Sequence, residues 1–362
     1  MARVLIIGGY GNFGSFIARR LAQEADITVI IAGRSEEKAK ALAENLKAEW
    51  TALDIEKNLD ESLKNIKPDI VIHTSGPFQE RGYDVAEACI RNKCHYIDLA
   101  DGREFVANIT RLDSAAKEAG ILVVSGASSV PCLTAAIIDK YKSEFQHLES
   151  IDYGIATAQR TNAGLATTAA ILGYAGKPFT TKIDGKIQIV YGWQSLTAHQ
   201  YPELGWRLLG NCDIPDLGVF PSRYPDLKTI RFRAGLEVPL LHMGLWAMSW
   251  FVRIGLIKSL RSLASALYKI APLFDAFGSN RSAFHMEMKG QDANGKQKVL
   301  TFYILTGSGH GPNIPCIPSI LLAQRLACGE IVKTGAAPCM DMIDLESYLK
   351  ALKDLDIKWE IQ

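Results

Sequence analysis

Short apolar runs alternate with amphipathic stretches over residues 1–125 of the chain. Apolar runs bounded by polar turns are typical of buried strands, and a 3.6-residue periodicity between them is typical of helices. The expected strands are Arg3–Ile7, Ile27–Ala32, Glu49–Leu53, Ile70–His73, His95–Asp98 and Ile121–Ser125. Because strands that alternate with helices form parallel sheets, the pattern predicts an α/β domain with a Rossmann-type, doubly wound parallel sheet.

The pattern changes near residue 150. Strand-like runs follow at residues 150–157, 181–191, 229–232, 284–289 and 299–305. Asp184-Gly185 and Asn294-Gly295 are strong hairpin signals, because both positions of a tight hairpin turn require positive φ. The sequence therefore predicts a first domain over residues 1–130 and a second α+β domain over residues 131–312, with a mixed or antiparallel sheet.

A glycine-rich turn links the first strand to the first helix. Gly9, Gly11 and Gly14 fit the pattern G-x-G-x-x-G, with Asn12 and Phe13 between the last two glycines. In a dinucleotide-binding turn the first glycine allows a tight turn, the second lets a pyrophosphate approach the backbone, and the third lets helix and strand pack closely. Free N–H groups at the helix start favour the negative charge. These five residues are the predicted pyrophosphate site.

The end of the second strand indicates which dinucleotide binds. NAD-binding domains usually carry a carboxylate there, which holds the ribose 2′-hydroxyl. Here Arg34 and Ser35 follow Gly33, and a guanidinium fork suits a 2′-phosphate. This favours NADP over NAD. The alternative is that Ser35 only caps the next helix, with Glu36 and Glu37 in its first turn.

The carboxyl ends of the other strands supply further candidates, because ligands of open parallel sheets bind at that edge. Asp54 is expected near the adenine, and Tyr96 and Asp98 are the candidate catalytic residues on the substrate side. His73 is expected to be a hydrogen-bonded core residue. The cofactor's nicotinamide half is expected along Ser75, Gly76 and Pro77.

Composition narrows the functional class. The chain has 362 residues, 48% of them hydrophobic and 22% charged, with a formal net charge of +1, which gives no sign of a nucleic-acid partner. Its seven cysteines are scattered and odd in number, which indicates reduced thiols in the cytoplasm. Cys89 and Cys94 lack metal-site spacing, so we predict buried thiols and no metal.

Several motifs together resemble the saccharopine dehydrogenase-like (saccharopine reductase-like) oxidoreductase family. They are the turn at Gly8–Gly14, Gly33-Arg34, and the stretches 75–78, 94–99 and 125–131. The resemblance implies a substrate and dimerisation domain in the second half. It also implies that the helices of residues 313–362 return to the dinucleotide-binding domain.

The resemblance adds candidates in the second half. His310, in a glycine-flanked turn, is a candidate proton carrier, although a glycine-flanked histidine is often a bystander. Arg160 and Asn162, before a predicted helix, are candidate substrate-binding residues, with a capped surface loop as the alternative. The family commonly shows Pro-Glu near the C-terminus, whereas this chain has Pro338-Cys339, which weakens the case for saccharopine as substrate.

Residues 238–257 form an unusually apolar stretch. The stretch could span a bilayer by length, but Pro239, His242 and Arg253 argue against a transmembrane helix. Three alternatives remain: a helical hairpin in an interface, the lining of a pocket for an apolar substrate, or a face that rests on a membrane surface.

These features favour an NADP-dependent oxidoreductase that transfers a hydride between the nicotinamide and a C–N or C–O bond of a small, rather apolar substrate. A homodimer is expected, and no residue stands out as a general acid. The alternative function is a non-catalytic NADP-binding sensor or a membrane-peripheral interaction protein.

Overall fold

The computed structural model of the chain describes residues 1–79, 81–161 and 164–362. These residues form two compact units. The first contains residues 1–136 and 313–351, and the second contains residues 137–312 and 352–362. The division between the domains therefore lies six residues beyond the expected position, and the last eleven residues lie in the second unit rather than with the C-terminal helices.

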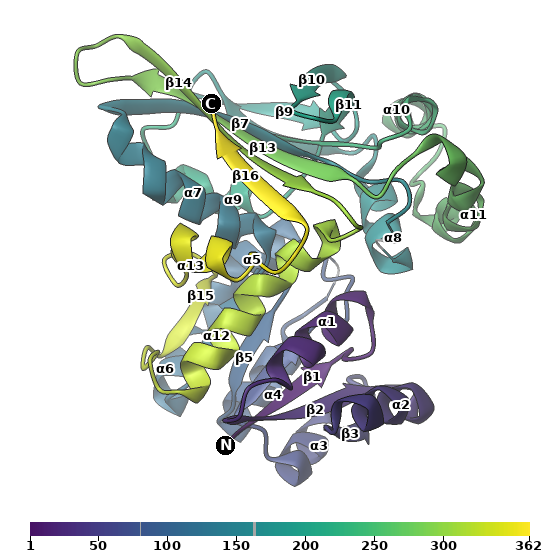
Figure 1. Ribbon diagram of the computed structural model, residues 1–362, viewed down its shortest axis with the longest axis vertical. Coiled ribbons are helices and arrows are strands. Elements are labelled where there is room, and N and C mark those ends of the chain that lie inside the picture. Colours follow the sequence, from purple (N-terminus) through teal and green to yellow (C-terminus); the bar gives the residue numbers. More distant parts are fainter. Residues whose placement is uncertain (80, 162–163) are drawn as a thin grey trace. The chain divides into compact units, whose positions relative to one another are not determined.

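The first unit is built on a seven-stranded parallel sheet with the order β15-β6-β5-β4-β1-β2-β3 (Figure 1). The order reverses at β1, so the predicted doubly wound sheet is confirmed. Its strands are β1 Ala2–Ile7, β2 Ile27–Gly33, β3 Glu49–Ala52, β4 Ile70–His73, β5 His95–Asp98, β6 Leu122–Ser125 and β15 Gly335–Pro338.

The seventh strand, β15, was not expected from the sequence. Its residues, GAAP, contain no β-branched or aromatic side chain. β15 lies at the sheet edge, parallel to β6, and the Ala336 N–H donates to Asp113 Oδ1 at 2.9 Å. Pairing with β6 therefore produces a strand that local propensity does not predict.

Helices cover this sheet, and one large core lies against α3, α4 and α6. Leu5, Val71 and Tyr96 of the sheet pack in this core with Leu63 of α3 and Cys89 of α4. Cys89 and Cys94 are buried there, as expected for structural thiols. The helices are α1 Asn12–Leu21, α2 Glu36–Leu46, α3 Leu59–Ile66, α4 Asp84–Asn92, α5 Arg103–Ala107, α6 Asp113–Ala119, α12 Ile317–Ala327 and α13 Leu345–Lys350.

Residues 313–351 belong to the first unit. Helix α12 contacts α1, the Cys316 Sγ lies 3.8 Å from the Phe13 carbonyl oxygen, and the Ser319 hydroxyl donates to the Ala127 carbonyl at 3.0 Å. These contacts place the start of α12 beside the glycine-rich turn and beside the end of β6.

The second unit contains a seven-stranded mixed sheet with the order β10-β11-β12-β7-β13-β14-β16. Only β7 and β12 pair in parallel, so the expected mixed sheet is confirmed. Both hairpin signals are confirmed too: Asp184-Gly185 joins β8 to β9, and Asn294-Gly295 joins β13 to β14. The strands are β7 His147–Ala156, β8 Pro178–Ile183, β9 Lys186–Tyr191, β10 Thr197–Tyr201, β11 Gly205–Asn211, β12 Thr229–Gly235, β13 Ser282–Gln291, β14 Gln297–Thr306 and β16 Ile357–Ile361.

Different elements pack on the two faces of this sheet. Helices α7 (Thr134–Tyr141) and α9 (Asp216–Arg223) lie on one face, where the Tyr153 hydroxyl donates to Asp216 Oδ2 at 2.8 Å (Figure 1). On the other face the β10–β11 hairpin folds over the sheet, and His199 of β10 stacks on His285 of β13 with ring centroids 3.7 Å apart. The remaining helices are α8 Leu165–Tyr174, α10 Pro239–Arg253 and α11 Ala264–Ile270.

Candidate functional site

The glycine-rich turn has the geometry of an anion cradle. Gly8 directly follows β1 with φ +80°, and the Gly11 N–H donates back to the Gly8 carbonyl at 2.8 Å. Helix α1 then starts at Asn12 with Gly11 as its N-cap. The residue with positive φ is thus Gly8, not Gly9, to which the motif had assigned the tight turn. Gly9 instead packs closely against β2, since a Cβ at this position would lie 3.0 Å from an Ile31 side-chain methyl.

Gly14 allows the close helix–strand packing that the motif predicts. A Cβ at Gly14 would collide with the Gly8 carbonyl oxygen and lie 2.8 Å from the Gly9 Cα. The first turn of α1 has no acidic side chain, whereas Arg19 and Arg20 occupy its last turn. The positive end of the helix dipole therefore faces the turn without a competing carboxylate, which favours a bound pyrophosphate.

Arg34 lies at the end of β2, beside the glycine-rich turn. Its side chain is exposed, and no ion pair with another described residue is found for it. Ser35 caps α2, accepting the Lys38 N–H at 3.3 Å, so the capping role is confirmed. The Tyr10 hydroxyl accepts the Ser35 N–H at 3.0 Å. This contact joins the glycine-rich turn to the strand end where a 2′-phosphate is expected.

The end of β4 is tied to the end of β1 by Thr74. Its hydroxyl donates to the Ile7 carbonyl at 2.9 Å, and a Cβ on Gly8 would lie 2.7 Å from that hydroxyl oxygen. Ser75, Gly76 and Pro77, predicted to line the cofactor, continue from this junction, with a cis peptide between Gly76 and Pro77. The sequence motif did not single out Thr74, although its place directly after an apolar strand is a usable signal.

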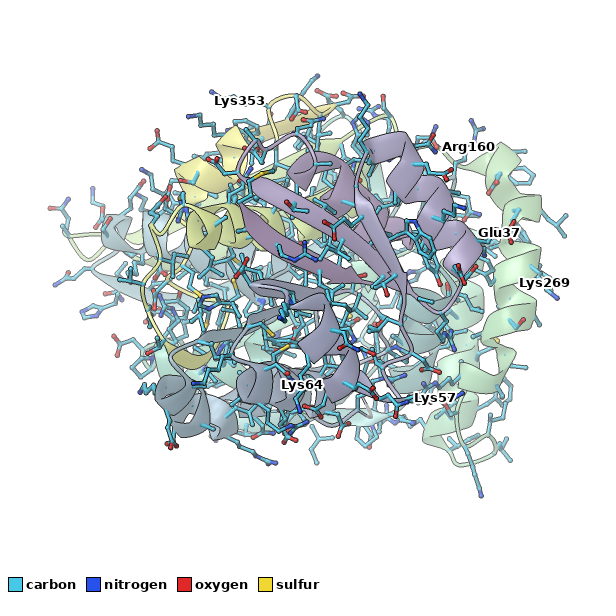
Figure 2. The ribbon with its side chains drawn as sticks, turned by 90° about the horizontal axis from the view of Figure 1, so that it is seen from below. Glu37, Lys57, Lys64, Arg160, Lys269 and Lys353 are labelled. Carbon is cyan, nitrogen blue, oxygen red and sulfur yellow. The ribbon has the colours of Figure 1, made fainter. Side chains whose placement is uncertain are left out.

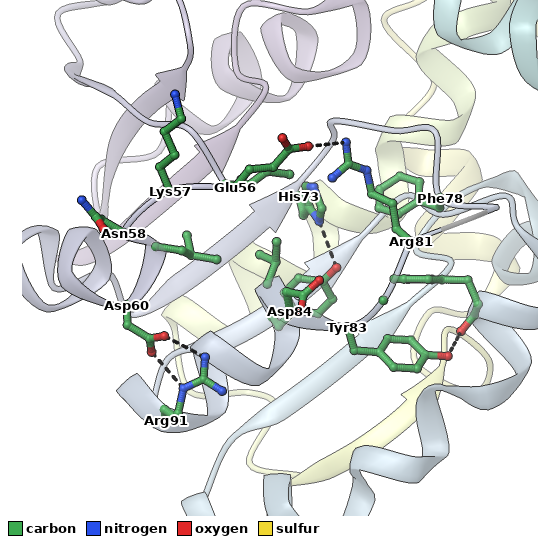
Figure 3. Close-up of a pocket in the computed structure, with 16 residues that line it drawn as sticks. Glu56, Lys57, Asn58, Asp60, His73, Phe78, Arg81, Tyr83, Asp84 and Arg91 are labelled. Carbon is green, nitrogen blue, oxygen red and sulfur yellow. Dashed lines mark hydrogen bonds and ion pairs between the residues drawn. The ribbon is translucent and has the colours of Figure 1, made fainter.

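A cavity of about 370 Å³ opens beside the ends of β3 and β4 (Figure 3). Its walls are the loop after β3, the loop after β4, the start of α4, and aromatic side chains of the core. Two ion pairs frame it, Arg81 with Glu56 at 3.5 Å and Arg91 with Asp60 at 2.8 Å. The lining residues are Ile55–Asp60, His73, Phe78, Arg81–Val85, Arg91, Tyr96 and Phe105.

Asp54, predicted near the adenine, lies just before this cavity. Its Oδ1 accepts the Glu56 N–H at 3.2 Å, and its Oδ2 lies 3.8 Å from the Lys57 ammonium. The carboxylate therefore shapes the loop that forms one wall of the cavity.

His73 joins the cavity to the core. Its Nδ1 lies 3.1 Å from the Tyr96 hydroxyl and its Nε2 lies 3.0 Å from the Ser75 hydroxyl. Burial, together with the Arg81 charge, lowers the pKa of His73 to about 3. The ring is therefore neutral near pH 7, and the prediction of a hydrogen-bonded core histidine is confirmed.

Asp98 and Tyr96 are both buried. Asp98 Oδ1 accepts hydrogen bonds from the Ala100 and Gly126 N–H groups at 2.9 and 2.8 Å, and from the Ser125 hydroxyl at 2.9 Å. Burial raises the pKa of Asp98 to about 6 despite these donors. Burial and the Asp98 charge also raise the pKa of Tyr96 well above its usual value. Asp98 thus joins the ends of β5 and β6, and its catalytic role stays a prediction.

The other two described candidates lie in the second unit. His310 Nδ1 accepts the Asp356 N–H at 2.8 Å, so its Nε2 is the nitrogen left to exchange a proton. Arg160 Nε donates to the Asp275 carbonyl oxygen at 2.8 Å, which orients its guanidinium. Asn162 lies outside the described residues. The roles of these three residues stay predictions.

This fold and this turn define the first unit as a Rossmann-type dinucleotide-binding domain. Residues 4–124 match the family model described as the saccharopine dehydrogenase NADP binding domain. The resemblance to the saccharopine dehydrogenase-like family is confirmed, as are the predictions of an NAD(P)-dependent oxidoreductase and of NADP as its cofactor. No curated protein matches the sequence.

Solved structures agree on the fold. Apo histidine-tagged saccharopine dehydrogenase (L-Glu forming) from Saccharomyces cerevisiae matches with a TM-score of 0.67 and 16% identity, over 100% of both chains. An amine dehydrogenase from Mycobacterium smegmatis matches with a TM-score of 0.51 and 11% identity, over 93% of this chain and 94% of that one. At these identities the likeness confirms the two-unit α/β architecture.

Proposed function

We propose that the protein is an NADP(H)-dependent reductase or dehydrogenase of a small, rather apolar substrate. One observation carries the proposal. The glycine-rich turn leads into the start of α1, whose first turn has no acidic side chain, and the exposed Arg34 lies nearby at the end of β2. When bound, NADPH would donate a hydride to a C–N or C–O centre of the substrate, or NADP+ would accept one from it.

The chain's own residues would bind and orient the cofactor. Gly9, Gly11, Asn12, Phe13 and Gly14 would hold the pyrophosphate at the start of α1. Arg34 and Ser35 would bind the 2′-phosphate, since a guanidinium makes strong charge-assisted hydrogen bonds with phosphate oxygens. Ser75, Gly76 and Pro77 would line the nicotinamide half.

The cavity beside β3 and β4 would take the adenine. Ile55 and Phe78 offer apolar surface for a flat ring, and the Arg81 guanidinium lies at the same wall, paired with Glu56. Pockets that bury an aromatic ligand combine apolar walls with a few polar groups in this way.

The substrate side is the less specified part of the proposal. Tyr96 and Asp98 would act from the end of β5, His310 from a turn of the second unit, and Arg160 from the segment before α8. Asn162, outside the described residues, belongs to the same prediction. The cytoplasmic location and the homodimer belong to the same proposal. All seven cysteines are among the described residues and no disulfide joins them, which supports a reducing compartment.

Titration of the purified protein with NADPH and NADH, followed by cofactor fluorescence, tests the proposal. We expect clear NADPH binding and weak NADH binding, and then NADPH oxidation or NADP reduction with a panel of amines, amino acids and carbonyl compounds. Binding without turnover across the panel would favour the alternative of a non-catalytic sensor. Absence of binding to either cofactor would refute the proposal.

A further inference from the structure

Helix α10 buries polar side chains and exposes apolar ones, which is the reverse of the usual pattern for a surface helix. Its buried positions include His242 and Ser249, together with Leu245 and Val252. Its outward positions recur every three or four residues and therefore share one face of the helix. The exposed residues on this face are Leu240, Met243, Gly244, Ala247, Trp250 and Phe251, continued by Ile254, and Arg253 at the end of the helix is exposed and charged. A helix with an apolar outer face normally has something apolar against that face.

The turn after α10 extends this apolar face. Gly255 adopts φ +81° at the end of the helix, and the Ile257 N–H donates to the Phe251 carbonyl at 3.2 Å. Ile254 is 63% exposed and Leu256 is 70% exposed, while Ile257 is also exposed. We call Ile254–Ile257 the apolar tip. Against the part of the chain that the structure describes, these three aliphatic side chains stay exposed, which is an unusual concentration of apolar surface in water.

Cations border the apolar tip. Arg253 precedes it and Lys258 follows it, and Arg261 and Lys269 come next along the chain. Lys269 projects outward from α11 (Figure 2). From Val238 to Phe274 the sequence contains no Asp or Glu. The next carboxylate, Asp275, accepts a hydrogen bond from Gln159 Nε2 at 3.0 Å, so it is already engaged.

Arg253 also links the tip to aromatic side chains. Its guanidinium carbon lies 3.9 Å from the ring centroid of Tyr191 and 4.8 Å from that of Trp250. Aromatic rings and cations at the rim of an apolar surface are typical of segments at a membrane–water interface.

We propose that α10 and the apolar tip bind the surface of a bilayer that contains anionic phospholipid. The tip would enter the acyl boundary, α10 would lie in the interface plane, and Arg253 and Lys258 would stay at the level of the phosphates. No helix among the described residues is long and apolar enough to cross a membrane, so the contact is with one face of the bilayer. A two-fold symmetric contact between two copies at the tip would place the same cations opposite each other. Their repulsion disfavours a second copy as the binding partner of this surface.

Vesicle flotation tests this proposal. The full-length protein is mixed with vesicles of phosphatidylcholine alone, or with about one quarter phosphatidylglycerol, which makes the surface negative. We expect flotation with the anionic vesicles and loss of binding in about 0.5 M salt, where the charge attraction is screened. Replacement of both Leu256 and Ile257 by Asp should lower binding at least about tenfold, because two apolar side chains no longer enter the bilayer. Lys258→Ala should lower binding roughly fivefold.

A matched control comes from another exposed apolar pair of the same unit. Ile187 and Ile189 of β9 are 65% and 66% exposed, and their double replacement by Asp should leave flotation unchanged. Circular dichroism and thermal unfolding report the folding of every variant, because NADPH binding to the first unit would not detect misfolding of the second unit, which carries the tip and β9. If the parent protein does not float with anionic vesicles, or if the β9 variant loses binding as strongly as the tip variant, the proposal is wrong. A dimer that the tip variant alone disrupts would show a second copy as the occupant instead.

Discussion

The ring of Tyr10 lies directly on the backbone of Gly33. A Cβ at residue 33 would lie 2.8 Å from both the Cζ and the hydroxyl oxygen of Tyr10, and that hydroxyl accepts the Ser35 N–H at 3.0 Å. The glycine-rich turn and the end of β2 are therefore one structural piece. The residues expected to hold the pyrophosphate and the 2′-phosphate are positioned together by this contact.

Gly33→Ala should disturb this piece because the added methyl overlaps the Tyr10 ring. We expect a loss of about 1–3 kcal/mol in the free energy of unfolding, as for other overpacked sites, together with weaker NADPH binding. In a double-mutant cycle with Tyr10→Ala, the methyl should cost much less once the ring is gone. Additive effects of the two changes in denaturant titrations would contradict the contact.

Arg34→Ala should affect the affinities for NADPH and NADH differently. Loss of a charge-assisted contact worth about 1.5–3 kcal/mol weakens NADPH binding by more than about tenfold and leaves NADH binding nearly unchanged. Lys40→Ala, an exposed cation later in α2, serves as the control and should change neither affinity. Equal losses for both cofactors in fluorescence titrations would refute the 2′-phosphate assignment.

Gly11→Ala and Gly14→Ala should have different consequences. A Cβ on Gly11 meets only the Gly8 carbonyl oxygen, at 3.1 Å, so that variant is expected to fold with a nearly unchanged Tm. Its methyl would occupy the position of the pyrophosphate, and NADPH affinity should fall by about tenfold or more. Gly14→Ala overlaps backbone atoms and should lower both Tm and affinity. Normal NADPH binding by the Gly11→Ala protein would show that the pyrophosphate does not bind at this turn.

Asp98 should make stability depend on pH. Its pKa is raised from 3.8 to about 6 in the folded protein, so the unfolded chain releases this proton first as pH rises. Stability is therefore lost between about pH 4 and pH 6, by up to about 3 kcal/mol from this group alone. Asp98→Asn keeps a side-chain oxygen for the three donors but cannot ionise.

The comparison of wild type and Asp98→Asn isolates this effect. His73, whose pKa is lowered to about 3, gives the opposite pH dependence, but it is present in both proteins and cancels. We expect the free energy of unfolding of the variant to increase relative to that of the wild type as the pH rises from about 4 to 7. A difference that is constant over this range in urea titrations would show that the Asp98 carboxyl keeps its ordinary pKa.

Tyr96→Phe should distinguish a proton-transfer role from a packing role. The hydroxyl lies 3.1 Å from His73 Nδ1, and its removal should cost about 1 kcal/mol of stability if it only completes that hydrogen bond. A catalytic hydroxyl would instead lower kcat by about a hundredfold or more and remove one limb of the pH–rate profile, with KM nearly unchanged. An unchanged kcat would take Tyr96 out of the predicted catalytic set.

Local sequence patterns were sufficient to predict the Rossmann-type unit, the glycine-rich turn and the preference for NADP. These features depend on local physics: apolar periodicity, the steric freedom of glycine, and the absence of a carboxylate at the end of β2. The same local reasoning found the two hairpins at Asp184-Gly185 and Asn294-Gly295, because their turn residues are selected by backbone geometry.

Long-range contacts, which no local pattern contains, select the segments without a strong strand pattern that join the sheets. The strands β15 and β16 exist because β6 and β14 offer unpaired backbone groups to segments distant in sequence, and turns at residues 351–355 lead into β16. Likewise the outward apolar face of α10 and the Tyr10–Gly33 contact could not be read from periodicity. Burial depends on what packs against an element, and that partner is chosen by long-range contacts that a local pattern does not contain.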